Sequence, residues 1–245
     1  MRPGARVRSL VARAADLVFP PHVFDGGERA QATGFTPEAW SRVAFLEKPV
    51  CDGCGAPFEV DPLDRCAACQ ARPYAFQRAR AACLYDEASR ELILRYKHGD
   101  RTEHAGLFAR WIARAAADLI VDAEAVAPVP LHPLRLLGRR FNQSAEIARP
   151  LARAAGLEYL PDVLKRTRAT PSQGGKSGRG RARNVRGAFA APEDRRKRIK
   201  GRRVLLVDDV MTTGATLDAC ARALLDAGAR AVDCAVVARV RHRTL

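Results

Sequence analysis

Two adjacent carboxylates stand directly before a run of small residues in VLLVDDVMTTGATLDAC, residues 204–220. The apolar VLLV is typical of a buried strand, and the small residues that follow it are typical of a loop that opens a helix. Backbone N–H groups at a helix start bind anions, and the helix dipole adds to the affinity. We call the predicted anion-binding residues the anion loop: Thr212, Thr213, Gly214, Ala215 and Thr216.

The paired acids Asp208 and Asp209 would repel a bare phosphate bound beside them. Because they precede the anion loop by a few residues, their carboxylates can reach a different part of the same ligand. Hydroxyl groups or a magnesium ion would suit them there. A sugar phosphate satisfies both demands. The stretch lacks the GxxxxGK[ST] and GxGxxG orders, which argues against a nucleoside triphosphatase and a Rossmann oxidoreductase.

Four of the seven cysteines form two CxxC pairs, separated by eleven residues, in CDGCGAPFEVDPLDRCAAC. Each CxxC turn lets two thiolates converge on one ion, and four sulfurs complete a tetrahedral zinc site with no open coordination position. Two disulfides are disfavoured by an intracellular context, and four unrelated thiols by the paired spacing. We therefore predict one structural zinc site, with the ligands Cys51, Cys54, Cys66 and Cys69. The remaining thiols, Cys83, Cys220 and Cys234, fit core positions.

Predicted strands and helices alternate along the rest of the chain. Strands are predicted at 79–85, 125–130, 157–164, 201–209 and 229–240, and helices at 88–100, 104–120, 144–156 and 213–228. Pro150 is expected to kink or divide the third helix. This alternation predicts an α/β fold with a mainly parallel sheet flanked by helices. Ligands of such folds bind at the carboxyl ends of the strands, where VLLVDD ends.

A segment rich in Gly, Ser and Arg interrupts this pattern at 166–187. It fits either a disordered linker or a mobile active-site flap. Because the strand and helix pattern resumes at Ala188, we interpret it as a flap of one domain.

Composition limits the classes of partner. The chain of 245 residues carries a formal charge of +15, which suits nucleic acid or a phosphorylated metabolite. The densest basic cluster, RRKRIKGRR at 195–203, is interpreted as a solvated loop.

No apolar run approaches the roughly 18 residues of a membrane span. Charges interrupt the N-terminal apolar stretch, which fits an amphipathic helix better than a secretory signal. We expect a soluble, cytoplasmic protein without a membrane span.

VLLVDDVMTTGAT resembles the signature of the type I phosphoribosyltransferases. In that superfamily the paired acids meet the ribose hydroxyls of phosphoribosyl pyrophosphate, and the loop holds its 5-phosphate. ELILRYKHGD, VPLHPLRLLGRRFNQSAEIARPLA, LKRTRATPSQ and RNVRGAF extend the resemblance to the ComF family of competence-associated, phosphoribosyltransferase-like proteins, over roughly 45–240.

The ComF resemblance implies three parts of the chain. These are an N-terminal helical segment with a degenerate first ribbon at 1–48, a zinc ribbon at 49–75 and a phosphoribosyltransferase-like domain at 76–245. Many relatives carry a double ribbon, but residues 19–40 contain no cysteine, so we expect one metal site.

The resemblance also implies roles for individual residues. Asp208 and Asp209 would be catalytic, holding the ribose or stabilising its developing positive charge, with Mg²⁺ neutralising the leaving pyrophosphate. Pyrophosphate contacts would come from Arg139, Arg140 and Lys97, each of which also fits a solvated surface position. The flap would bring a further basic residue to the leaving group: Arg168, Lys176 or Arg183.

Two functions from different classes fit these features. The first is a phosphoribosyltransferase whose acceptor the sequence does not identify. The second is a noncatalytic protein of DNA uptake whose ribbon and basic surface bind single-stranded DNA or a competence helicase. Single-strand binding usually needs exposed aromatic residues. The aromatic content of 6% weakens the second function without excluding it.

Overall fold

The computed structural model of the chain describes residues 40–58, 64–98, 104–131, 141–168, 185 and 187–241. By its internal contacts the chain divides into two units, 1–43 and 44–245, and every element discussed below belongs to the second. Among the described residues, none of the helices combines the length and the apolar character of a membrane span.

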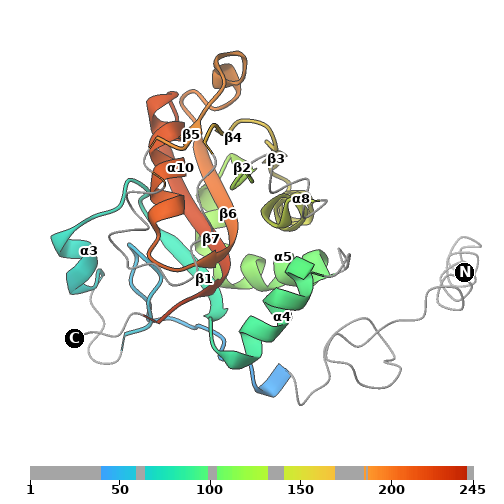
Figure 1. The fold of residues 1–245 in the computed structure, drawn as a ribbon. Helices are drawn as coiled ribbons and strands as arrows, with labels where there is room; N and C mark the ends of the chain where they lie inside the picture. Colours follow the sequence, from blue (N-terminus) through green and yellow to red (C-terminus); the bar gives the residue numbers. More distant parts are fainter. Residues whose placement is uncertain are drawn as a thin grey trace, which may run out of the picture. The chain divides into compact units, whose positions relative to one another are not determined.

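The centre of the 44–245 unit is a five-stranded sheet with the strand order β1-β7-β6-β2-β3 (Figure 1). All four strand pairs are parallel. The predicted α/β fold with a mainly parallel sheet is therefore confirmed. The strands are β1 Ala79–Leu84, β2 Ala125–Pro128, β3 Glu158–Tyr159, β6 Arg203–Met211 and β7 Ala231–Arg239.

Burial explains the composition of the inner strands. All nine residues of β7 are buried, and so are all four of β2. A parallel strand covered on both faces is expected to be continuously apolar, in contrast to the alternation of a half-exposed strand. The three cysteines outside the CxxC pairs are buried in this core, as predicted: Cys83, Cys220 and Cys234.

Helices cover the sheet. Helices α5 and α8 contact each other and the sheet, whereas α10 contacts β6 and β7 (Figure 1). The helix predicted at 104–120 is observed as two, because the chain leaves helical geometry at Ala116. The helices are α3 Ala67–Ala71, α4 Glu87–His98, α5 His104–Ala115, α6 Ala117–Asp122, α8 Gln143–Ala155 and α10 Ala215–Asp226, with the 3-10 helix η1 at Glu193–Arg198.

Helix α8 continues through Pro150 as a single helix, so of the two predicted effects, a kink or a division, the division does not occur. A proline inside a helix removes one backbone hydrogen bond. The buried face of α8 offsets this loss, since Ile147 and Leu151 are fully buried on either side of the proline. Packing against the sheet therefore keeps the helix continuous.

Two short strands mark the base of the predicted flap. Strands β4, Lys165–Arg166, and β5, Phe189–Ala190, pair antiparallel. The Arg166 guanidinium lies over the Phe189 ring, 5.3 Å from its centroid. Most of the flap, including Lys176 and Arg183, lies outside the described residues. Its two ends meet in one ladder, as expected for an excursion from a single domain.

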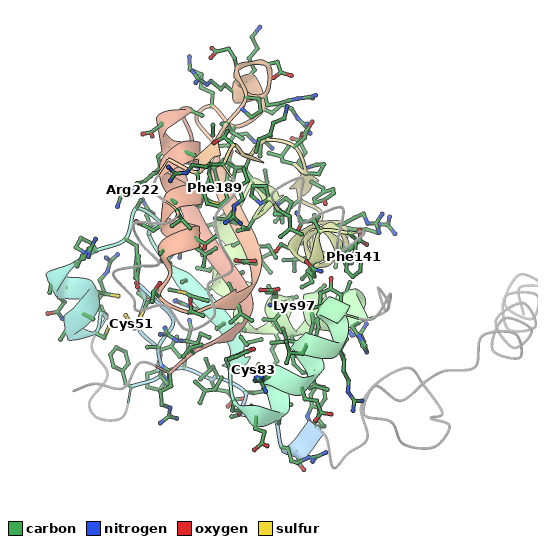
Figure 2. The ribbon with its side chains drawn as sticks, viewed as in Figure 1. Cys51, Cys83, Lys97, Phe141, Phe189 and Arg222 are labelled. Carbon is green, nitrogen blue, oxygen red and sulfur yellow. The ribbon has the colours of Figure 1, made fainter. Side chains whose placement is uncertain are left out.

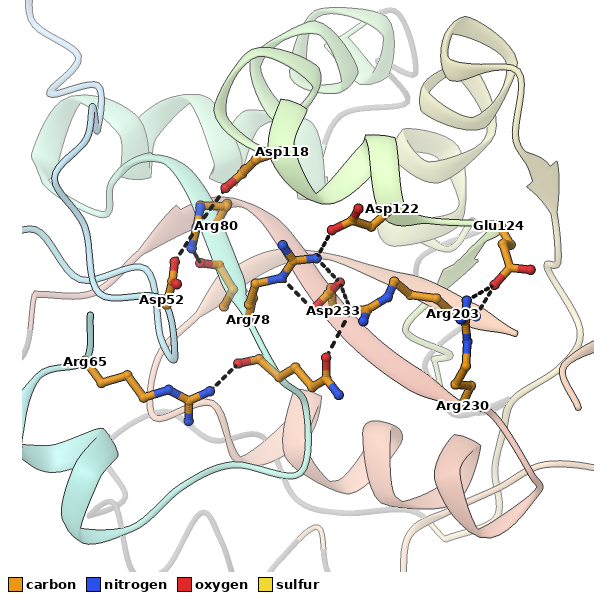
Figure 3. A network of polar contacts seen from close by, with 12 residues as sticks. Asp52, Arg65, Arg78, Arg80, Asp118, Asp122, Glu124, Arg203, Arg230 and Asp233 are labelled. Carbon is orange, nitrogen blue, oxygen red and sulfur yellow. Dashed lines mark hydrogen bonds and ion pairs between the residues drawn. The ribbon is translucent and has the colours of Figure 1, made fainter. Parts of the chain in front are cut away.

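An ion-pair network joins the amino ends of the sheet strands (Figure 3). The Asp233 carboxylate, 1% exposed, lies 2.8 Å from the guanidinium of Arg78 and 2.8 Å from that of Arg203. Arg78 also pairs with Asp122 at the end of α6. Because the strands are parallel, this network lies at the edge of the sheet opposite to the carboxyl ends.

Replacing the buried acid should destabilise the fold. Asp233→Asn removes the negative charge between two arginines, and removing one partner of a buried pair costs about 3 kcal/mol. We expect the free energy of unfolding in urea to fall by about that amount. The control Glu193→Gln, in an exposed pair with Arg196, should change it by less than about 1 kcal/mol. Equal effects of the two variants would contradict a structural role for the network.

Candidate functional site

The carboxyl end of β6 carries the paired acids. Strand β6 ends at Met211, two residues beyond the predicted end, so Asp208 and Asp209 lie inside the strand. They face neighbours from two helices that are distant in sequence. The structure thus surrounds the acids with side chains from α4 and α8 as well as with the anion loop.

Lys97 lies in the last turn of α4 (Figure 2) and forms an ion pair with Asp209. The Lys97 ammonium lies 2.8 Å from Asp209 Oδ2, and the two side chains are only 17% and 15% exposed. Of the basic residues predicted to contact pyrophosphate, Lys97 is therefore beside the acids. Arg139 and Arg140 lie outside the described residues.

Asp208 has a different set of neighbours. The Ser144 hydroxyl donates to Asp208 Oδ1 at 2.8 Å, and the Asp209 backbone N–H donates to the same oxygen at 2.9 Å. Ser144 is held in place by Asn142, the N-cap of α8, whose side chain accepts from the Ser144 N–H and donates to the Val129 carbonyl. The cap therefore fixes the start of α8 to the end of β2.

Ser144 was not among the site residues predicted from the sequence. The available signal was Asn142 just before the predicted helix, since Asn is a preferred N-cap residue. Such a signal predicts a cap but does not predict that the serine hydroxyl faces a carboxylate 64 positions away in the chain.

The environment of Asp208 alters its protonation. Burial and, next in size, the neighbouring charge of Asp209 together raise the pKa of Asp208 to about 7. The hydrogen bonds from Ser144 and from the Asp209 N–H act in the opposite direction, as does the charge of Lys97. Asp208 is thus poised between its neutral and ionised forms near neutrality. A cation or a hydroxyl donor beside it would favour the ionised form.

The anion loop joins β6 to α10. Its glycine, Gly214, has the left-handed backbone angles φ 73° and ψ −2° at the N-cap of α10. A Cβ there would lie 2.8 Å from Tyr74 Cε1 and 2.9 Å from Met211 Cε. Conformation and space therefore both require glycine.

Polar groups of the anion loop remain available for a ligand. Helix α10 begins at Ala215, and the first N–H groups of a helix have no partner within it. The Thr213 hydroxyl is buried and has no hydrogen-bond partner among the described residues. A phosphate oxygen satisfies donors of both kinds. Thr212, Thr213, Ala215 and Thr216 are each partly exposed.

The four predicted zinc ligands lie together at one end of the 44–245 unit. The sulfurs of Cys51, Cys54, Cys66 and Cys69 all lie within 4.8 Å of one another. Zinc–sulfur bonds of about 2.3 Å in a tetrahedron place the sulfurs about 3.8 Å apart. The observed Cys54–Cys66 sulfur distance is 3.8 Å. The four thiols therefore fit a closed, structural zinc site.

Backbone and side-chain contacts attach this cysteine module, residues 50–77, to the sheet. Gly55, at φ 67°, brings the chain so close to Ala79 that a Cβ would lie 2.9 Å from its carbonyl oxygen. Arg239, fully buried at the end of β7, donates to the Cys54 carbonyl. The module is thus anchored to the sheet strands β1 and β7.

Comparison with known proteins identifies the domain family of the C-terminal part of the chain. Residues 142–245 match the Phosphoribosyl transferase domain family. The fold and this match define a protein with a phosphoribosyltransferase domain. Among solved structures, the chain matches part of glutamine phosphoribosylpyrophosphate (PRPP) amidotransferase from B. subtilis. It is 25% identical, with a TM-score of 0.38 over 58% of this chain and 30% of that chain.

Two relatives extend the similarity beyond that domain. DNA utilization protein YhgH of Escherichia coli (strain K12) is 33% identical over 198 residues, which cover 78% of this chain and 85% of the relative. Competence protein F of Haemophilus influenzae is 29% identical over 193 residues, which cover 74% and 80%. The chain belongs to the ComF family of phosphoribosyltransferase-like proteins.

Metal analysis should find one zinc ion per chain. Cys66→Ser should lower this content, because a hydroxyl replaces one of the four thiolates that zinc requires. It should also lower the melting temperature, because metal binding stabilises a module this short. Cys83→Ala, outside the cluster, should keep the zinc. Full zinc content in Cys66→Ser, measured by mass spectrometry of the purified protein, would contradict the assignment.

Asp208 should make stability depend on pH. An ordinary aspartate has a pKa of about 3.9, so folded Asp208 binds its proton more tightly than the unfolded residue. Its contribution to stability is complete below about pH 3.9, falls as the pH rises and is lost once the pH has passed about 7. Asp208→Asn removes this loss. Its melting temperature relative to wild type should therefore be higher at pH 8 than at pH 5, by about 2–4 °C for each kcal/mol relieved.

Calorimetric scans of both proteins at the two pH values test this expectation. Asp194→Asn, at a 71% exposed side chain, should show the same difference from wild type at both values. If Asp208→Asn behaved like this control, Asp208 would not carry the raised pKa.

Proposed function

We propose that the chain binds phosphoribosyl pyrophosphate, or a related ribose 5-phosphate, together with Mg²⁺. The observation that carries this proposal is the juxtaposition of the paired acids with the anion loop on one strand-to-helix connection. Carboxylates accept hydrogen bonds from ribose hydroxyls, and the loop N–H groups donate to a phosphate. A ribose phosphate carries both groups in one molecule.

Asp208 and Asp209 would contact protein groups in the ligand-free state and the ribose hydroxyls in the complex. Without a ligand, Lys97 neutralises Asp209, and Ser144 donates to Asp208. When the ribose hydroxyls donate to these carboxylates, the Lys97 ammonium is released toward the pyrophosphate. Binding thereby exchanges contacts within the protein for contacts with the ligand, and no buried charge is left unpaired.

The chemistry that fits these groups is displacement of pyrophosphate from the anomeric carbon by the nitrogen of an acceptor base or amine, so that a C–N bond forms as the bond to pyrophosphate breaks. Positive charge develops on the ribose ring in that reaction, and fixed carboxylates beside the ring stabilise it. Carboxylate oxygens are suitable ligands for Mg²⁺, which when bound would neutralise the leaving oxygens. The residues needed are then Asp208, Asp209 and Lys97, without a side-chain nucleophile.

Binding of DNA has less support on the surface of the protein. The basic cluster at 195–203 is partly neutralised, since Arg195 and Arg198 pair with Asp162 and Arg202 pairs with Glu158. Charges satisfied within the protein contribute less to phosphate contacts. The relatives' names refer to competence and DNA utilization, and a role of this chain in such a process is compatible with a ribose phosphate pocket.

Calorimetric titration with phosphoribosyl pyrophosphate and Mg²⁺ tests the proposed pocket. We expect the double variant Asp208→Asn, Asp209→Asn to lose at least about 100-fold in affinity, since each hydrogen bond to a charged group contributes about 1.5–3 kcal/mol. Pyrophosphate release, where an acceptor is found, should vanish in the same variant.

The matched control is Asp162→Asn, which removes the carboxylate that pairs with Arg195 of the basic cluster and should keep wild-type affinity. Wild-type affinity in the double variant would overturn the pocket. Tight binding without turnover on any base or amine would favour a sensor over an enzyme.

A further inference from the structure

The segment that follows the last cysteine of the module crosses to the anion loop. The Tyr74 hydroxyl donates to the Thr213 carbonyl at 3.0 Å, across 139 positions of sequence. One residue further, the Ala75 N–H donates to Asp218 Oδ1, in the first turn of α10, at 2.7 Å. The proposed function uses neither contact.

The bond from Tyr74 fixes one peptide group of the anion loop. A trans peptide is planar, so the Thr213 carbonyl and the Gly214 N–H point in opposite directions. Holding the carbonyl toward Tyr74 therefore holds the N–H away from Tyr74. This restraint matters at Gly214, because glycine has the widest choice of backbone angles. A rotation of the peptide would point a carbonyl oxygen toward a bound anion instead of an N–H.

The Tyr74 ring is itself firmly held. It stacks on Phe76, with centroids 4.6 Å apart and planes 11° apart, and Phe76 is only 2% exposed. The ring lies so close to Gly214 that no Cβ would fit between them. Burial raises the pKa of Tyr74 to about 12, so the hydroxyl keeps the proton that it donates.

We propose that Tyr74 is a positioning residue of the anion loop, through which the cysteine module sets the direction of the Gly214 N–H. The ligand concerned is the 5-phosphate of a ribose phosphate, and in this respect the inference rests on the proposed function. The cysteine module is then part of the binding site.

Tyr74→Phe tests the hydroxyl alone, because it keeps the ring that packs on Phe76 and Gly214. The first readout needs no ligand: the ¹⁵N relaxation order parameter of the Gly214 amide. We expect about 0.85 in wild type and below about 0.6 in Tyr74→Phe. The control Tyr159→Phe removes a hydroxyl that also donates to a backbone carbonyl, that of Ala145, and should keep the wild-type value. An equally ordered Gly214 in Tyr74→Phe would overturn the proposal.

The second readout is the affinity for ribose 5-phosphate. The loss of one hydrogen bond of about 0.5–1.5 kcal/mol should weaken binding by about 2–12-fold in Tyr74→Phe. Disorder at Gly214 with unchanged affinity would overturn the role in binding. If wild type bound no ribose phosphate, the proposed function would fail, and the order parameter would still decide whether Tyr74 holds the loop.

The hydrogen bond from the Ala75 N–H to Asp218 is a second tether between the cysteine module and α10, and it provides an independent pair of variants. Asp218→Ala removes the acceptor of the Ala75 N–H and should disorder Gly214 in the same way. Asp218→Asn keeps an oxygen at that position and loses only the charge that pairs with Arg222. It should behave as wild type. An Asn variant as disordered as the Ala variant would contradict the tether and point to the Arg222 pair.

Discussion

The parallel pairing of β6 with both β2 and β7 is the constraint on which the site depends. Parallel strands end at the same edge of a sheet, so the chain must leave β6 through a loop into a helix at that edge. The acids lie within the last four residues of β6, and the anion loop begins directly after the strand. The distance between the two halves of the site is therefore set by the backbone of one strand, which neighbours on both sides hold in register.

Two carboxylates placed this close need compensation even without a ligand. The protein provides it unequally: Asp209 faces an ammonium, and Asp208 faces a hydroxyl and a backbone N–H. Burial and the charge of Asp209 raise the pKa of Asp208 to about 7, against the effect of its hydrogen-bond donors. The two carboxylates therefore differ: one is paired with an ammonium, and the other is one that a cation or a ribose hydroxyl can recruit.

The parts of this site that are local in sequence were predictable, and the parts that come from distant elements were not. The strand, both acids, the anion loop and the paired cysteines each occupy one continuous motif with a recognisable period or spacing. Ser144 and Tyr74 reach β6 and its loop from elements 64 and 139 positions away. No local pattern encodes those contacts. Lys97 was anticipated only through the ComF resemblance, and the continuity of α8 through Pro150 depended on tertiary packing that the sequence does not display.

Contacts between distant elements also explain how a small cysteine module can position the anion loop far along the chain. A short segment has too little apolar area to hold a tyrosine in place by itself. Four sulfurs that converge on one point restrain its turns, and the buried Arg239 joins them to the end of β7. The end of β7 is also the neighbour of Met211, the residue before the anion loop, through the bond from the Val240 N–H to the Met211 carbonyl. Module and loop are thus fixed to the same strand ends, so the tyrosine between them is held from both sides.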